Sequence, residues 1–426
     1  MAKNRVIYQS DALFVSKGVD STGVSQHAQL RRVQSANYSF NVARQDVNQF
    51  GQLARLEAII LEAPTVSFDA SYLLGDGFNE QALGFANGSG LNKGFISGQI
   101  ASTSGQNFYI LTAPEGIDAN FNTTSTGYGT IGIGNAFLTD YTLDASVGSI
   151  PTVSVSFEGT NMNATSAVSG TNGGIAGLEG TIGYSGISGV GINPIDGTLL
   201  TAMTSAKQIL TDAGKTNATN KTNGIVLPLA SEGTGILIDG EDQGIAGGVV
   251  SALRPGDISL SFANADGDAI VDLDGDGAAH VQSVSISIPL GRTPIDRLGS
   301  RFSFARVVDF PITPTLSVSA IVSETQSRAL TDIINDDAFI SSIQILFKKS
   351  SSSAVAGGIN DNLHQAAYKM TNLKLDSEAF SSSIGPNKTV DLSFSLSIGG
   401  PDDPVNNVFF SGANTGTVIG NAQFTS

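Results

Sequence analysis

The feature that most constrains the fold is an internal repeat of alternating segments. Residues 33–44 and 281–292 share a Val-Gln-Ser start, a serine at position 39 or 287, and a closing arginine. Between these identities, apolar residues fall at matched positions and alternate with polar ones. A period of two places one face of a strand in a core and the other in polar surroundings. The sequence therefore predicts antiparallel strands that recur in two halves of the chain.

The match continues beyond these first segments. The further aligned pairs are 47–51 with 295–299, 59–60 with 307–308, 64–70 with 314–320 after a two-residue insertion, and 139–144 with 371–376. The last pair is followed in each half by a turn with glycine (Gly148; Gly385) and an alternating strand (152–157; 390–396). We interpret residues 1–160 and 252–426 as two copies of one β-domain.

The alternation assigns side chains to faces. We expect polar surroundings, either solvent or a lumen, for Ser39, Asn41, Ser67, Asp69, Ser287, Ser317 and Ser319. We expect a core position for Tyr38, Phe40, Val66, Phe68, Ile286, Ile288, Leu316 and Val318. An introduced charge at Phe40 or Ile288 is then expected to prevent folding, because it would be buried without a partner.

Helices are expected at few places. Thr293–Gly299 has the capping threonine, first-turn proline and closing glycine of a short helical turn, and Ser323–Ile334 has helical apolar spacing. Residues 161–251 are rich in glycine and contain one aromatic residue, Tyr184. We interpret them as an inserted surface module or connector with one helix at Thr198–Ala213.

Composition removes several function classes. The chain has no cysteine or tryptophan and three histidines, so thiolate chemistry is excluded and histidine chemistry has little material. Its formal net charge of −16 opposes DNA binding through phosphate neutralisation, although solubility alone also explains such a charge. The sequence shows neither a membrane span nor a Sec-type signal peptide, so we expect a soluble protein without membrane partners.

The candidate chemical sites are weak. Asp272–Gly277 resembles the start of a calcium loop, but Ser283 stands where the loop needs a glutamate, so a hairpin turn is the simpler interpretation. The pairs Asp336-Asp337 and Asp402-Asp403 lack hydrolase spacing. The histidines do not share a site between the repeats, and Lys348–Ser353 is interpreted as a loop tip; the histidines are His27, His280 and His364. We predict no catalytic, cofactor-binding or metal-binding residue, no cofactor, and no enzyme activity.

The repeat-matched arginines leave two interpretations open. Arg44 and Arg292 each follow the first strand of a repeat. Each is either a solvated strand end or one half of a salt bridge across a subunit joint, where an acidic neighbour would favour it.

Two stretches carry a family resemblance. Residues 284–300 running into 309–318, and residues 137–148 followed by 151–155, resemble bacteriophage tail tube proteins. The resemblance covers both repeats but not the glycine-rich segment. It implies a mainly β fold of two tandem β-sandwich or barrel domains, each flanked by a short helix. In that family, sheets of neighbouring subunits join into one inner barrel, and fused double domains form trimeric rings with pseudo-sixfold symmetry.

The resemblance also implies a role and partners. It predicts a structural virion protein of the phage tail, assembled in the host cytoplasm into stacked rings with a polar, acidic lumen through which double-stranded DNA passes without specific binding. The expected partners are further copies of the chain and other tail proteins: a terminator, a baseplate or tip, a tape measure and, where the tail is contractile, a sheath. A decoration or baseplate component, or a non-viral β-rich surface protein, remains an alternative.

Overall fold

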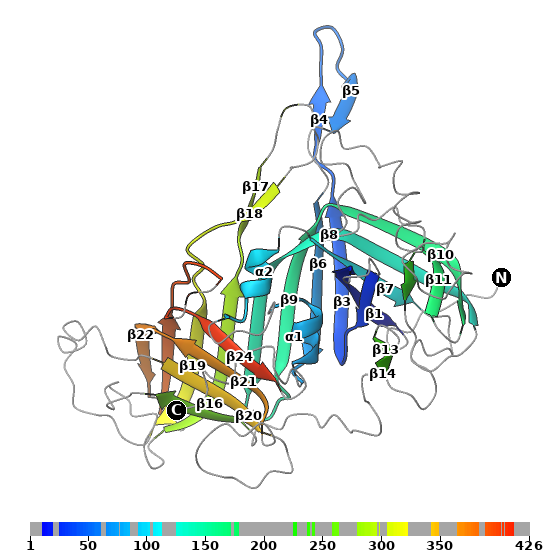
Figure 1. Ribbon diagram of the computed structural model, residues 1–426. Helices are drawn as coiled ribbons and strands as arrows, with labels where there is room; N and C mark the ends of the chain where they lie inside the picture. Colours follow the sequence, from blue (N-terminus) through cyan, green and yellow to red (C-terminus); the bar gives the residue numbers. More distant parts are fainter. Residues whose placement is uncertain are drawn as a thin grey trace.

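The chain is mainly β, with large antiparallel sheets (Figure 1). The computed structural model describes residues 11–19, 25–60, 65–75, 77–85, 93–102, 105–112, 125–171, 174–178, 225–227, 237–238, 241–242, 258–263, 279–295, 298, 305–322, 342–348, 364–382, 388–401, 403 and 405–412. Its two described helices are short, α1 (Phe78–Ala82) and α2 (Ser97–Ala101). Neither has the length and apolar character that a transmembrane helix requires.

One continuous sheet forms the centre of the molecule. Its order is β3-β6-β9-β8-β16-β19-β23-β22, and every neighbouring pair is antiparallel. The bounds are β3 (Val33–Asn41), β6 (Thr65–Leu73), β8 (Ser125–Ser146), β9 (Thr152–Gly159), β16 (Ala279–Pro289), β19 (Thr315–Val322), β22 (Lys374–Ser381) and β23 (Thr389–Ser395). The first four strands come from the first repeat and the last four from the second, so the sheet is two similar halves joined at β8 and β16.

The strand registers of the two halves correspond at a constant offset in residue number. Ala36 pairs with Ala70, and the residues 248 positions later, Val284 and Val318, also pair. The same shift relates the two-stranded arms that follow β3 and β16, which are β4 (Arg44–Val47) with β5 (Glu57–Ile60) and β17 (Arg292–Ile295) with β18 (Ala305–Val308). Paired residues on β6 and β19 lie 248 positions apart, the same offset as for β3 and β16. The alignment of 64–70 with 314–320, which needed a two-residue insertion, is therefore wrong.

The second half of each repeat follows a different shift. Leu143 pairs with Val153, and Phe380 pairs with Val390, so corresponding residues lie 237 positions apart. This shift also matches Gly148 with Gly385, but it corrects the alignment of 139–144 with 371–376 by five residues. Bulges occupy corresponding places as well, at Thr139 and Asp376. The bulges of the first strands correspond too, at Gln34 and Gln282, and bulges of this kind hold a register in place.

A second layer of strands covers the apolar face of each half. In the first repeat, β1 (Ala12–Val19) lies between β2 (Ser25–Gln29) and β7 (Gln106–Thr112), and β7 pairs with the first part of β8. The other side of β8 pairs with β10 (Asn161–Thr171), which begins in the segment expected to be a connector, and β11 (Gly174–Leu178) and β12 (Ile225–Leu227) follow. In the second repeat, the order is β15 (Ile258–Ala263), β20 (Ser342–Lys348), β21 (His364–Thr371) and β24 (Val408–Gly412). A separate pair, β13 (Leu237–Ile238) and β14 (Glu241–Asp242), completes the described strands.

The core lies between the layers and runs through both repeats. Phe78 of α1 and the phenylalanines that flank the helices, Phe85 and Phe95, join it. Phe95 contacts Tyr141 of the first repeat as well as Tyr368 and Phe410 of the second. The backbone N–H of Phe95 donates to the carbonyl oxygen of Val408 at 2.6 Å. The segment carrying α2 therefore closes the apolar space between the two repeats.

Of the three helices expected from local sequence signals, one is wrong in its first residues and two fall outside the described residues. The expected helical turn at Thr293–Gly299 is wrong over its first residues, because Arg292–Ile295 forms strand β17 and pairs with β18. Cap signals are local, and the cross-strand hydrogen bonds of the arm override them. The expected helices at Ser323–Ile334 and Thr198–Ala213 lie outside the described residues.

Candidate assembly surfaces

The joint inside the chain, where β8 meets β16, shows how two repeats fit together. Leu143 lies opposite Ile286 and Tyr141 opposite Ile288, and all four side chains are fully buried. On the other face of the sheet, the Ser285 hydroxyl donates to the Asp144 carboxylate at 2.6 Å. The joint thus continues both the core and the polar face from one repeat to the next.

Further contacts strengthen this internal joint. The Tyr141 and Tyr368 hydroxyls are 2.7 Å apart and hydrogen-bonded, and burial raises the pKa of both phenols well above the usual value. Arg306 of β18 makes an ion pair with Glu158 of β9 at 3.0 Å. A charge-assisted contact of this kind fixes the relative position of the two halves.

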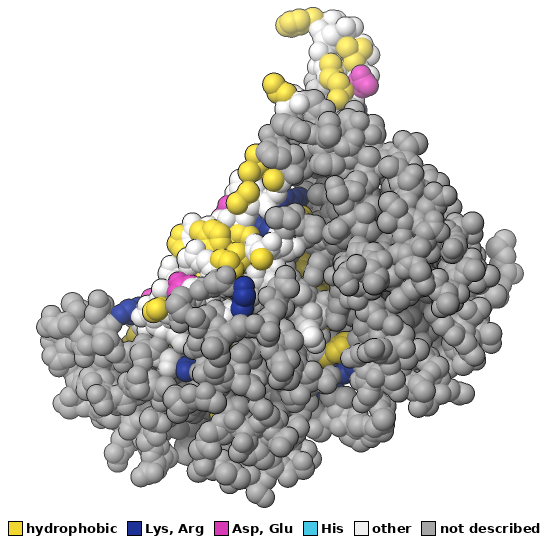
Figure 2. Space-filling model, viewed as in Figure 1, with side chains coloured by type: hydrophobic (Ala, Val, Ile, Leu, Met, Phe, Trp, Pro, Cys, Tyr) yellow, Lys and Arg dark blue, Asp and Glu magenta, His cyan; other side chains and the backbone are white. Residues whose placement is uncertain are grey.

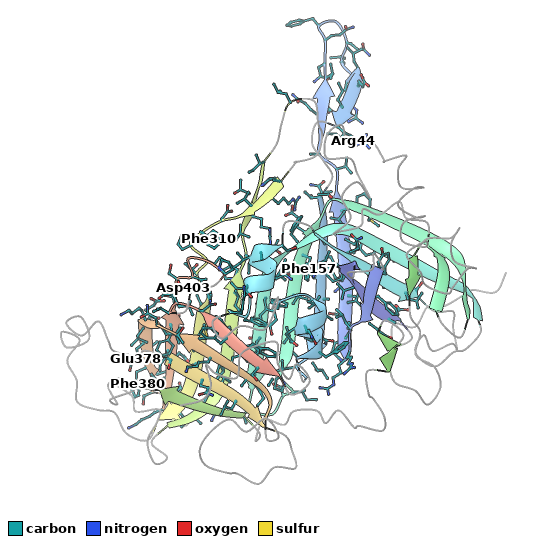
Figure 3. The ribbon with its side chains drawn as sticks, in the orientation of Figure 1. Arg44, Phe157, Phe310, Glu378, Phe380 and Asp403 are labelled. Atoms are coloured by element: carbon teal, nitrogen blue, oxygen red, sulfur yellow. The ribbon has the colours of Figure 1, made fainter. Side chains whose placement is uncertain are left out.

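The two repeat-matched arginines lie in different environments. Arg292 donates to the carbonyl oxygens of Gln99 and Arg306 and lies 4.8 Å from the ring centre of Phe137. Burial, followed by the nearby Arg306, lowers its pKa to about 10. Arg44 is exposed near the start of its arm (Figure 3). Arg292 therefore lies at a joint between repeats, where it contacts carbonyl oxygens and an aromatic ring instead of a carboxylate. The ion pair at this joint is made by Arg306, which the sequence analysis did not single out.

The outer edges of the sheet expose apolar side chains. Among the described strands, β3 pairs with β6 alone and β22 with β23 alone. Tyr38 is 39% and Phe40 60% exposed on β3, and Phe380 is 51% exposed on β22. The expected core positions of Tyr38 and Phe40 are therefore wrong for the single chain, because no described strand covers that part of the edge. The remaining core assignments are confirmed: Val66, Phe68, Ile286, Ile288, Leu316 and Val318 are buried.

A carboxylate stands among the apolar side chains of the β22 edge. Glu378 and Phe380 lie close together on this outer strand (Figure 3). Glu378 is half-buried, and its Oε2 atom is buried without a hydrogen-bond partner. Desolvation raises the pKa of this carboxyl group. An acid in such surroundings favours its neutral form more than a solvated one does.

The opposite face of the sheet is polar and acidic. Ser39, Asn41, Ser67, Asp69, Ser287, Ser317 and Ser319 are exposed or half-exposed on it, as the alternation predicts. The cross-strand pairs place Asp69, Asp140, Asp144, Glu158 and Asp391 on the same face, with Lys374 near the β22 edge. Three of these acids accept hydrogen bonds from neighbouring hydroxyls: Asp69 from Ser156 at 2.7 Å, Asp140 from Thr142 at 2.8 Å and Asp144 from Ser285 at 2.6 Å. Hydroxyl and carboxylate groups therefore line this face of the sheet in both repeats.

Both arms carry apolar side chains into solvent. The arms extend from the same end of the sheet (Figure 1), and Figure 2 shows apolar groups on the arm tip and on the surface below it. Corresponding residues of the two arms are similarly exposed: Val47 37% and Ile295 40%, Ile59 38% and Val307 50%, Phe50 107% and Leu298 103%. Leu53 adds a fully exposed leucine to the first arm. The two arms therefore share one pattern of exposed apolar side chains.

The other residues singled out by sequence do not converge on a chemical site. Asp403 accepts hydrogen bonds from the backbone N–H groups of Val405 and Asn406, both at 2.9 Å, and these bonds lower its pKa, so it stabilises a turn. His27, His280 and His364 lie on strands β2, β16 and β21, but their side chains, together with Asp272–Gly277, Asp336-Asp337, Asp402 and residues 349–353, lie outside the described residues. Within the part of the chain that the structure describes, no group of three His, Asp or Glu residues could hold a metal ion.

Comparison with known proteins gives no assignment. The sequence matches no protein-family model, and no curated protein matches it. Among solved structures, a crystal structure of a type VI secretion system effector from Yersinia pestis is similar at 9% identity and a TM-score of 0.17, over 36% of this chain and 97% of that chain. What the chain does is therefore inferred from its own sheet edges, arms and polar face.

Proposed function

We propose that this chain is the structural subunit of a bacteriophage tail tube. The observation that carries the proposal is the continuous sheet of two similar halves, joined at β8 and β16 and ending in two strands whose described pairings lie on one side only. An open edge is a template for pairing with another chain, and ring closure removes it. Three chains supply six halves, so a closed ring of three chains has pseudo-sixfold symmetry.

The arms support stacking of such rings. They project from one end of the sheet, while the β8–β9 turn at the opposite end exposes Val147 (62%) and Ile150 (41%). A head-to-tail arrangement brings the arms of one ring against the opposite end of the next ring. Such a heterologous contact does not close on itself and extends into a tube.

The polar face supports a lumen for DNA. In a closed ring the apolar face of the sheet is covered by the outer strands, so the acidic face lines the opening. Its carboxylates repel phosphates, and its hydroxyls carry no positive charge for counterion release. DNA can therefore pass along this surface without being held. The proposed role is structural and involves no catalytic step, and the partners are other copies of the chain and the remaining tail proteins.

The mass of the smallest closed assembly tests this proposal. Native mass spectrometry of the concentrated protein should show a species of three chains in equilibrium with the monomer, followed by multiples of three. Closed trimers that never stack would favour a decoration or baseplate component. A monomer at every concentration, even with a tail-tip initiator present, would exclude the tube.

A further inference from the structure

The joint that closes a ring has the same parts as the joint inside the chain. The internal joint pairs β8 with β16, and ring closure pairs β22 of one chain with β3 of the next. β22 corresponds to β8 at a shift of 237 residues, and β3 corresponds to β16 at a shift of 248. The bulges at Thr139 and Gln282, which lie in the ladders within each half, recur at Asp376 and Gln34, so both strands of the second joint keep the shape of their counterparts.

From this correspondence we propose one register for the joint between chains. Phe380 lies opposite Tyr38 of the neighbouring chain, Glu378 opposite Phe40, and Ala379 opposite Ser39. The internal counterparts of these pairs are Leu143 with Ile286, Tyr141 with Ile288, and Thr142 with Ser287. This inference rests on the proposed function and specifies how its rings close.

The exposure of the apolar side chains supports this register. At the internal joint, Leu143, Ile286 and Ile288 are 0% exposed, whereas their counterparts Phe380, Tyr38 and Phe40 are between 39% and 60% exposed. A second copy placed in the same register covers all three at once. A slip by one residue would instead turn these side chains to the polar face, because side chains alternate along a strand.

The polar face fits the same register. Ser381 and Asn37 take the places of Asp144 and Ser285, which are hydrogen-bonded inside the chain. Both replacements can donate and accept hydrogen bonds. The polar row of the lumen therefore continues from one chain to the next without setting like charges against each other at this pair.

The joint between chains lacks the polar anchors of the internal joint. Ala58 and Ser395 stand at the places of Arg306 and Glu158, so the ion pair is absent. Glu378 replaces Tyr141, whose hydroxyl bonds to Tyr368. The joint between chains is therefore the weaker of the two and opens first. This difference lets single chains persist until several joints form together in a ring.

Paired cysteines can test the register, because the chain has no native cysteine. At the internal joint, Leu290 N–H donates to the Thr139 oxygen and Val147 N–H donates to the Gln282 oxygen, both flanking the ladder. Counting along the ladder makes Thr142 with Ser287 a non-hydrogen-bonded pair, and Ala379 with Ser39 its counterpart. Such pairs have Cα atoms about 4.5 Å apart, which allows a disulfide.

The test compares three double variants under mild oxidation. The pair A379C with S39C should link chains to covalent trimers on a non-reducing gel. The pair A379C with N37C is shifted by two residues and should not link, since diagonal neighbours lie about 7–8 Å apart. The internal pair T142C with S287C is the control and should form a disulfide within the monomer, with or without assembly.

The outcomes separate the register from the function. Rings or tubes in which the shifted pair links, or in which A379C with S39C does not link although the internal control does, would overturn the register and leave the tube proposal standing. A protein whose internal control links but which never assembles would contradict both. Covalent trimers from the A379C and S39C pair alone would establish the register.

Discussion

At the scale of single residues, the two repeats place similar side chains in different surroundings. Phe40 and Ile288 correspond in the duplication, yet Phe40 is 60% exposed and Ile288 is fully buried. Period-two alternation predicted which face each residue occupies, and it did so correctly for both. It could not predict that Phe40 stays exposed, because exposure on an outer strand depends on whether another strand pairs with it.

This difference gives a matched pair of substitutions. Ile288→Asp should lower the free energy of unfolding by more than about 4 kcal/mol, because it buries an unpaired charge. Phe40→Asp should lower it by less than about 1 kcal/mol, as expected for an exposed site, but should prevent ring formation. Chemical denaturation and size-exclusion chromatography measure the two effects. A Phe40→Asp protein that assembles normally, or one that fails to fold, would contradict the assignment of β3 as a joint.

If rings close through β22, Glu378 is expected to make their formation depend on pH. Its pKa is already raised by desolvation in the single chain, and covering it with Phe40 of the next chain removes more water. A carboxyl group whose pKa rises on assembly binds a proton more readily in the assembly than in the free chain. Its contribution therefore favours assembly at a pH below its pKa in the free chain, and this contribution is lost as the pH rises through its pKa in the assembly. Along the proposed joint, the charged residues near Glu378 are Lys374 and Asp376 on the same strand and Arg44 beyond the end of β3, while Asp391 lies on the polar face of the sheet.

The measurement is the concentration needed for half-assembly between about pH 5 and pH 8. For the natural protein this concentration should rise with pH. Glu378→Gln should flatten the curve and strengthen assembly most at the alkaline end. Asp376→Asn, on the same strand but exposed, serves as the control and should keep the natural slope. Equal slopes for all three proteins would show that Glu378 is not buried at the joint.

At the scale of elements, the first strand of each repeat could be predicted more accurately than the later strands. The Val-Gln-Ser start and the closing arginine gave the correct shift of 248 residues for β3 and β16. The later strands were aligned five residues off, because a short Thr-x-x-x-Leu-Asp likeness outweighed the bulges that set the register. A bulge is a feature of pairing between strands, and single-sequence patterns do not reveal it.

The arms were the least predictable elements. Their first residues carry helix-cap signals in the second repeat, where the structure has strand β17. Only the structure shows that Phe50 and Leu298 stand at matched positions in solvent. Both copies keep the same exposed pattern, which the proposed stacking of rings would cover.

Substitution at the arm tips should separate ring formation from stacking. The double variant Phe50→Ser with Leu298→Ser removes apolar surface that stacking would bury, and each large apolar side chain contributes about 1.5–3 kcal/mol when buried. Closed rings should remain while tubes disappear at all accessible concentrations. Asn48→Ser with Gln52→Ser, two polar changes in the same exposed arm, should leave tube length unchanged.

Electron microscopy of the assembled fractions, identified by light scattering, shows whether rings, tubes or neither are present. Tubes of natural length from the apolar double variant would show that the arms do not hold successive rings. Loss of rings along with tubes would place the arms at the joint within the ring instead.

At the scale of the whole molecule, the mainly β fold and its duplication follow from the sequence, and the continuous sheet does not. Alternation indicates strands and the repeat indicates two similar halves, but neither says that β8 and β16 pair edge to edge. That pairing joins the two halves into one continuous sheet. In the proposed assembly, the acidic face, the projecting arms and the open edges would all belong to one segment of a larger ring.

Electron microscopy of the purified, concentrated protein tests the central claim most directly. The account predicts hollow tubes of stacked rings, with end views that show six similar lobes related by threefold symmetry, one chain for every two lobes. Dispersed single chains under conditions that preserve the fold, with a tail-tip initiator added, would contradict it.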